Sequence, residues 1–144
     1  MKVSIIRVRN EVQGVIFDKN NGGHVLLVRK RDRRIRRFHW RLLKGGIDEG
    51  ETKVEALRRE IFEETGLKNI NILEQVHDYE FVFKGMCHRV SSFLVNADSA
   101  EPVKLQESEL SDYVWAKPEN AKQLLYWYNE REALRKLGQF SESL

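Results

Sequence analysis

The chain has 144 residues, of which 41% are apolar and 33% are charged, and its formal net charge is +3. This composition is typical of a globular domain and excludes a disordered tail, a collagen-like fibre and a disulfide scaffold. No apolar run approaches the roughly 20 residues that span a bilayer, and Cys87, the only cysteine, has no partner for an internal disulfide. We therefore expect one domain over residues 1–144, located in the reducing cytoplasm.

The positive charge is concentrated in one short segment. Residues 29–37, RKRDRRIRR, contain seven basic residues and one Asp, a local charge of +6, so the rest of the chain sums to −3. A cationic segment on a mildly acidic body favours an anionic ligand nearby. A solvated loop would have the same composition, and the charge pattern alone leaves both interpretations open.

In chain order, the sequence begins with predicted strands and a basic loop. Their β-branched residues predict strands over residues 2–8, 12–18 and 24–28. The segment 29–37 is expected to be a loop. Beyond it, Gly45 and Gly46 permit an unusual backbone path where the chain enters the next element.

A helix is predicted over about residues 52–65. Thr52 and Glu55 have the spacing of a capping box, and Gly66 stands where a left-handed C-terminal cap is expected. The apolar stripe expected to face the core consists of Val54, Leu57 and Ile61.

The second half of the sequence completes a mixed α/β sandwich. Strands are predicted over residues 69–76, 79–84, 88–96 and 111–116. Pro118 suits the first turn of a helix that continues to about Leu137. Strands come first, a helix interrupts them and a second helix closes the chain, which predicts an α+β fold with a mixed sheet rather than a doubly wound sheet.

The predicted first helix carries three acids, Glu60, Glu63 and Glu64, on an adjoining surface. Their carboxylates repel one another, and Arg59 offsets part of that repulsion by pairing with Glu63 at i, i+4. Clustered acids beside an apolar stripe suit the oxygen ligands of a hard divalent cation such as Mg²⁺. Helices with Arg–Glu pairs are more often solvated surface, so this spacing alone does not decide between the two.

The residues that flank these acids favour the metal site. Residues 45–67, GGIDEGETKVEALRREIFEETGL, resemble the signature of the Nudix hydrolase family. Every specified position of that signature is filled, by Gly45, Glu51, Arg59, Glu60, Ile61, Glu63, Glu64, Gly66 and Leu67. The resemblance implies a loop–helix–loop in an α/β/α sandwich, a bound divalent cation and hydrolysis of a nucleoside diphosphate linked to another group.

The resemblance also implies roles for individual residues. Glu60 and Glu64 would ligate Mg²⁺, or Mn²⁺ in its place, together with the carbonyl of Gly45. Glu63 would ligate the ion or orient the attacking water, and Arg59 would hold the carboxylates in place. Outside the motif, an acid just before the last strand often serves as a ligand or base in related enzymes, and Glu109 is the candidate for that position, with Glu107 as a competitor.

Two further segments are similar to asymmetric dinucleoside tetraphosphate hydrolases, which cut diadenosine tetraphosphate (Ap4A) to ATP and AMP. These segments are residues 39–46, HWRLLKGG, and residues 109–134. The similarity implies that Lys44 contacts phosphate, and that His39 does so or packs beside the base. One departure is Leu43, which replaces the proline usual before the lysine. A tyrosine typical of these enzymes is also missing, and Phe83 stands near its position.

Aromatic residues on a predicted strand provide candidates for base stacking. Tyr79, Phe81 and Phe83 alternate along the strand and so share one face. We expect Tyr79 and Phe83 to bind substrate and Phe81 to be a core residue. Tyr126 and Tyr128 on the last helix fit either role.

The basic segment suits a polyphosphate, because Arg29 and Arg31 lie close in sequence to Lys44 and arginine makes bidentate phosphate contacts. Ap4A is the leading substrate from the sequence. The 5′-triphosphate end of an RNA, a (d)NTP and a diphosphoinositol polyphosphate fit the same charge. A nucleotide or RNA sensor on the same fold is the non-enzymatic alternative, although such a protein is expected to have lost one of the three helix acids.

Overall fold

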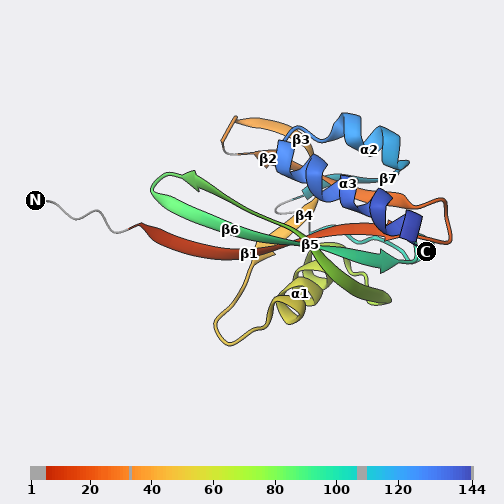
Figure 1. The fold of residues 1–144 in the computed structure, drawn as a ribbon, viewed down its shortest axis with the longest axis horizontal. Helices are drawn as coiled ribbons and strands as arrows, with labels where there is room; N and C mark the ends of the chain where they lie inside the picture. The colour runs from red at the N-terminus through yellow and green to blue at the C-terminus, as the bar shows by residue number, and fades with distance from the viewer. Residues whose placement is uncertain (1–5, 33, 107–109, 144) are drawn as a thin grey trace, which may run out of the picture.

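The structure is a computed structural model that describes residues 6–32, 34–106 and 110–143. It consists of a twisted sheet with one helix on one face and two helices on the other (Figure 1). The α+β sandwich with a loop–helix–loop predicted from the sequence is confirmed. No helix in the described part of the chain is long and apolar enough to cross a membrane.

The sheet formed by the described residues has seven strands. Along it the order is β3-β2-β1-β6-β5, while β4 pairs with β1 and β7 pairs with β2. The strands are β1 (Arg7–Asp18), β2 (His24–Asp32), β3 (Arg37–Arg41), β4 (Leu43–Gly46), β5 (Ile70–Phe83), β6 (Met86–Ala97) and β7 (Leu110–Ala116). The pairing of β1 with β6 is parallel and the other pairings are antiparallel, so the sheet is mixed as predicted.

Side chains of the central strand alternate between two hydrophobic cores, as the period of two in a strand requires. Val12 and Ile16 pack on the side of helix α1 (Lys53–Thr65). Val15 and Phe17 pack on the side of helices α2 (Pro118–Leu124) and α3 (Tyr128–Ser143). The sheet therefore separates the motif helix from the C-terminal helices.

Several predicted boundaries were wrong. The strands predicted over 2–8 and 12–18 form one strand over the described residues, and residues 2–5 lie outside them. Those predicted over 69–76 and 79–84 are also one strand, whose pairing with β6 shifts register between Ile72 and His77 and whose polar residues are largely exposed. The basic segment 29–37 is not a loop, because β2 runs on to Asp32 and β3 begins at Arg37, so only its tip connects two paired strands.

The single helix predicted from Pro118 to Leu137 is broken in two. The chain leaves helical geometry at Leu125, whose φ and ψ are −75° and 125°, and Leu125 forms a bridge with Trp40. The break lets Trp127 turn toward the sheet, where its indole N–H donates to Asp32 at 2.7 Å. Tertiary contacts have overridden the local preference for helix.

The apolar stripe predicted for α1 is correct at two of its three positions. Leu57 and Ile61 are fully buried, while the side chain of Val54 is 44% exposed. Val54 lies in the first turn of the helix, next to the loop that hangs away from the sheet in Figure 1.

One buried ion pair ties α3 to the sheet. The Arg41 guanidinium donates to Glu130, and the other Glu130 oxygen accepts from the backbone N–H of Leu42 at 2.7 Å. Both charged side chains are at least nine-tenths buried. Burial would lower the pKa of Arg41, but the adjacent carboxylate of Glu130 raises it, so the arginine stays charged.

We expect Glu130→Gln to lower the free energy of unfolding by about 3 kcal/mol, because Arg41 would then stay buried without its main counter-charge. Urea denaturation followed by circular dichroism measures this change. The matched control is Glu132→Gln on the same helix, which breaks a surface pair with Arg135 and should change stability little. Equal effects of the two substitutions would contradict a structural role for the buried pair.

Candidate functional site

The loop and helix of residues 45–67 are fixed at both ends by backbone geometry. At the start of α1, Thr52 Oγ1 accepts from the N–H of Glu55 and the Glu55 carboxylate accepts from the N–H of Thr52, both at 3.1 Å. At its end, Gly66 has a φ of 75°, which favours glycine. The predicted capping box and left-handed cap are therefore confirmed. Before the helix, β4 pairs Gly45 with Val12 of the central strand, which holds the loop against the sheet.

Arg59 lies at the centre of the acidic cluster. Its guanidinium donates to Glu51 at 2.7 and 2.8 Å, to Glu60 at 2.9 Å and to Glu63 at 3.2 Å. It also donates to the carbonyl oxygen of Gly46 at 2.9 Å. Hydrogen bonds from Arg59 lower the pKa of Glu51 to about 2, so this acid is ionised throughout the physiological range. One cation thus joins the loop to the acids of the helix.

Glu60 packs directly against Gly45. A Cβ atom at position 45 would lie 2.1 Å from the Glu60 carboxyl carbon, so no other residue fits there without displacing Glu60. This contact brings carboxylate oxygens beside the backbone of Gly45. Carboxylate and carbonyl oxygens form the donor set that Mg²⁺ prefers, and the residues at this position therefore fit a hard divalent cation.

The three helix acids do not share one environment. Glu63 is exposed and joined to Glu60 through Arg59, whereas Glu64 is only 4% exposed. Glu64 lines a small cavity that is otherwise formed by Val28, Lys30, Arg41, Leu42, Leu43, Lys44 and Leu110. In the described part of the chain, no three His, Cys, Asp or Glu side chains are arranged as a ready-made metal cage. Arg59 instead donates hydrogen bonds to carboxylate oxygens of Glu60 and Glu63, the groups expected to ligate a cation.

Lys44 connects the motif loop to a group of aromatic rings. It precedes Gly45, and its Nζ lies 4.7 Å from the centroid of the Phe81 ring and 3.9 Å from a Glu11 oxygen. Burial lowers the pKa of Lys44 to about 8, against the opposing effect of Glu11. Lys44 is therefore mostly protonated at neutral pH and supplies positive charge beside the loop.

The rings below Lys44 form a stacked column. Phe81 is parallel to His88 at 4.5 Å between centroids, and Tyr79 stacks on Phe81 at 6.3 Å. The Tyr79 hydroxyl donates to Gln13 at 3.0 Å, and burial raises its pKa. The expectation that Phe81 is a core residue was wrong. Its side chain is half-buried, lies outside both hydrophobic cores and contacts cations.

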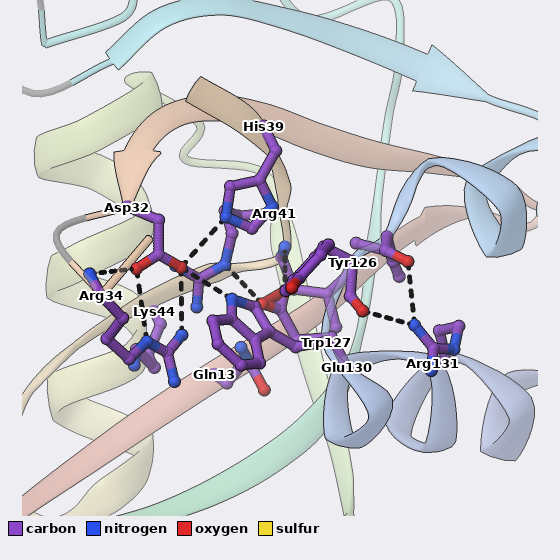
Figure 2. Close-up of polar contacts among 12 residues, drawn as sticks. Gln13, Asp32, Arg34, His39, Arg41, Lys44, Tyr126, Trp127, Glu130 and Arg131 are labelled. Atoms are coloured by element: carbon purple, nitrogen blue, oxygen red, sulfur yellow. Dashed lines mark hydrogen bonds and ion pairs between the residues drawn. The ribbon is translucent and has the colours of Figure 1, made fainter. Parts of the chain in front are cut away.

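A second polar cluster surrounds Asp32, a carboxylate that is only 4% exposed (Figure 2). Its oxygens accept from Trp127 at 2.7 Å, from His39 at 3.0 Å and from Arg41 at 3.2 Å. Arg34 adds hydrogen bonds from its backbone N–H and from two side-chain nitrogens. Burial would raise the pKa of Asp32, but the donors from Arg34, Trp127 and His39 hold it well below its usual range.

The other predicted site residues are dispersed. Arg29 and Arg31 are exposed on β2, where Arg29 lies 5.6 Å from the centroid of the Phe38 ring. Phe83 is at the far end of the β5–β6 hairpin, where Lys84 contacts its ring. His39 is held by a hydrogen bond with Asp32, and its ring lies edge to face with Tyr126 at 5.3 Å between centroids.

The remaining candidates contribute no contact to the site in the described part of the chain. Tyr128 is 63% exposed. Glu109 and Glu107 lie outside the described residues.

The sequence-based interpretation missed Asp32, Arg34 and Trp127 as members of one cluster. The single Asp within the basic run 29–37 could have indicated such a cluster, because an isolated acid among seven cations has several nearby groups with which to form ion pairs. Trp127 gave no signal of its own, since its role depends on the break between α2 and α3.

A cleft of about 370 Å³ also opens beside the motif loop, where α1 and its loop approach β1, β5 and β6. Its lining carries both signs of charge, from Lys53 and Arg89 and from the acids Glu11, Asp78 and Glu80. Ile47 and Tyr79 contribute apolar surface. Its size lies within the range of small-molecule sites in proteins.

The depressed pKa of Asp32 predicts a pH-dependent stability. Because the pKa is lower in the folded chain than the value of about 3.9 expected when unfolded, the contribution is present above about pH 4 and is lost as the pH falls further. We expect Asp32→Asn to lower the free energy of unfolding by on the order of 2 kcal/mol at pH 7. At pH 3 the difference in free energy of unfolding between the variant and the unmodified protein should be smaller. Urea denaturation at both pH values tests this, with the exposed Asp112→Asn as control. A difference in free energy of unfolding that is the same at both pH values would contradict a role for the ionised carboxylate.

Comparison with known proteins places the whole arrangement in a family. The family model described as NUDIX domain matches residues 8–137. An RNA pyrophosphohydrolase of Bartonella bacilliformis is 48% identical over 40 residues, which are 28% of this chain and 24% of the relative. The chain thus aligns with about a quarter of the length of the curated relatives it matches.

Solved structures resemble the chain over nearly its full length. A C. elegans Ap4A hydrolase in a binary complex superposes with a TM-score of 0.82 at 23% identity, covering 94% of this chain and 99% of the other. A second structure, of C. elegans Ap4A hydrolase, gives a TM-score of 0.74 at 25% identity, with coverage of 92% and 98%. The fold, the filled motif and the family match agree, and the chain belongs to the NUDIX domain family.

Proposed function

We propose that this protein is a divalent-cation-dependent pyrophosphohydrolase of nucleoside polyphosphates, with the asymmetric cleavage of Ap4A to ATP and AMP as its leading reaction. The observation that carries the proposal is the contact of Glu60, which Arg59 holds, with the backbone of Gly45. The largely buried cation of Lys44 immediately precedes that glycine. In this proposal, the acids and the Gly45 backbone would hold a hard cation beside Lys44, which would bind phosphate.

In this proposal, Glu60, Glu63, Glu64 and the Gly45 carbonyl would hold the cation, Mg²⁺ or Mn²⁺. When bound, such an ion neutralises charge on the pyrophosphate and lowers the pKa of a coordinated water. Nudix hydrolases generally use divalent cations of this kind. Arg59 is the group that keeps the acids together, because like charges on adjacent turns would otherwise separate them.

The residues of the chain then divide the remaining work. Glu63, the exposed acid of the cluster, is the candidate for orienting the attacking water or taking its proton. Lys44 binds phosphate oxygens, and Arg29 and Arg31 extend the positive surface along β2 for the rest of a phosphate chain. Glu109 stays a candidate acid on the basis of the motif resemblance alone.

Aromatic rings near Lys44 support a nucleotide over other anhydrides. Phe81 and Trp127 both lie beside the cationic groups of the site, and either ring can stack on a base. Tyr79, in the same stacked column, orients Phe81. Of Tyr79 and Phe83, the two rings that the sequence predicts to bind substrate, Phe83 is the weaker candidate because it lies at the hairpin tip. The cleft beside the motif loop has room for the second nucleoside of a dinucleotide.

The relatives support two substrates. The C. elegans structure at 25% identity carries the name Ap4A hydrolase, and it supports the dinucleotide. The Bartonella relative is named RNA pyrophosphohydrolase, and its 48% identity over a short segment supports the 5′ end of an RNA as the second candidate. An exposed surface that combines Arg29, Arg37, Phe38 and Tyr126 is compatible with single-stranded RNA as well.

Product analysis separates these candidates. The purified protein is incubated with Mg²⁺ and, in parallel, with Ap4A, a triphosphorylated RNA, a dNTP set and a diphosphoinositol polyphosphate. ATP plus AMP from Ap4A, at a kcat/KM well above the others, is the expected result. Release of pyrophosphate from RNA at the higher kcat/KM would assign the RNA end instead. No hydrolysis of any substrate would overturn the enzyme proposal and favour a sensor.

We expect Glu64→Gln to lower kcat by roughly two orders of magnitude or more, because removing a group that only supports a metal ligand already costs 10- to 100-fold. Steady-state hydrolysis of Ap4A with Mg²⁺ measures the loss, and circular dichroism confirms that the fold is kept. The matched control is Glu49→Gln, an exposed acid of the same loop that fills no specified position of the motif. Near-normal turnover in the Glu64 variant would remove the proposed metal site.

A further inference from the structure

Arg34 lies against the faces of two aromatic rings. Its guanidinium carbon lies 3.7 Å from the centroid of the Trp127 ring and 4.5 Å from that of Phe81. The two rings come from different elements, the α2–α3 junction and β5. A guanidinium is flat and stacks on aromatic faces much as a base does. While Arg34 is in this position, neither ring face that it covers can receive a nucleobase.

The position of Arg34 is held by Asp32. Both the Nε and Nη2 atoms of Arg34 donate to the Asp32 carboxylate, at 3.3 and 3.2 Å, and its backbone N–H donates at 2.9 Å. The same carboxylate accepts from the Trp127 indole, so one acid fixes both the arginine and one of the rings it covers (Figure 2).

The pair can separate without stranding a buried charge. If the Arg34 side chain leaves, Asp32 still has hydrogen bonds from Arg41, His39 and Trp127. Arg34 itself lies at the edge of the cluster, with 18% of its side chain exposed. Because its hydrogen bonds to Asp32 are charge-assisted, release at low energetic cost requires a new anionic partner for the guanidinium.

A base alone does not meet that requirement. Stacking of a base on the two rings replaces the cation–π contacts of Arg34, but it does not replace the charge-assisted hydrogen bonds to Asp32. A chain of phosphates does, because arginine binds phosphate oxygens in the same bidentate manner as it binds a carboxylate.

We propose that Arg34 is a specificity-determining residue that closes the base slot between Phe81 and Trp127 and yields it to ligands that carry both a base and several phosphates. This inference rests on the proposed function, since it takes the substrate to be a nucleoside polyphosphate. In a ligand with a base and a single phosphate, Lys44 binds that phosphate and no second one is left to hold Arg34 elsewhere, so such ligands bind weakly.

The test is the binding of AMP and of Ap4A to the full chain in EDTA, where hydrolysis does not occur, by titration calorimetry. We expect Arg34→Ala to bind AMP more tightly and Ap4A no more tightly than the unmodified protein does. The Kd for AMP divided by the Kd for Ap4A should fall by about tenfold or more, because the variant has lost both the group that competes with the base and a phosphate partner. Arg34→Lys keeps the charge without the flat group, so it should bind AMP more tightly while it retains most of the affinity for Ap4A.

The control variant is Arg36→Ala, an exposed arginine of the same hairpin, which should leave the ratio unchanged. Equal weakening of both ligands by Arg34→Ala would overturn the inference and make Arg34 an ordinary phosphate contact. An unchanged Kd for AMP would also overturn it, because the slot would then not be the base site. If the ratio is unchanged while Ap4A is still hydrolysed with Mg²⁺, the inference fails and the proposed function stands. Absence of hydrolysis fails the proposed function itself.

Discussion

The arrangement of the site depends on one guanidinium that holds several carboxylates against their mutual repulsion. Arg59 reaches forward to Glu63 on its own helix and back to Glu51 and the Gly46 carbonyl in the preceding loop. Without such a cation, acids crowded on neighbouring turns would turn outward into water. Because the loop is also paired with the central strand, the acids are fixed relative to the sheet as well as to one another.

The Asp32 cluster is the electrostatic reverse of this arrangement. Here a single buried carboxylate collects donors from the β2–β3 hairpin and from the α2–α3 junction. Lys44 links the two clusters. It immediately precedes the motif loop in the chain, and its Nζ contacts the Phe81 ring. One cluster gathers acids around a single guanidinium, and the other gathers cationic groups and an indole around a single carboxylate.

Local sequence patterns predicted the parts of the fold that local chemistry determines. The capping box at Thr52 and the left-handed cap at Gly66 involve residues only a few positions apart, and both are present. The break after α2 was not predictable in this way, because Trp127 leaves the helix for an acid 95 positions earlier in the chain. The role of Phe81 was missed for the same reason, since the cations that contact it belong to other strands and loops. Whether the predicted ligands bind metal and substrate stays a prediction.

The parallel pairing of β1 with β6 has a consequence for how the protein acquires its shape. This pairing runs from Arg7 beside Met86 to Phe17 beside Asn96, and the whole motif of residues 45–67 lies between the two strands in the chain. Contacts so distant in sequence form slowly, because a long segment must be ordered before they stabilise anything. During synthesis the acidic motif emerges before the residues of β6 have been made. Until then, the apolar residues of β1 remain exposed on both of its faces. The rate at which this central pair closes therefore sets the interval in which the new chain is exposed to aggregation and proteolysis.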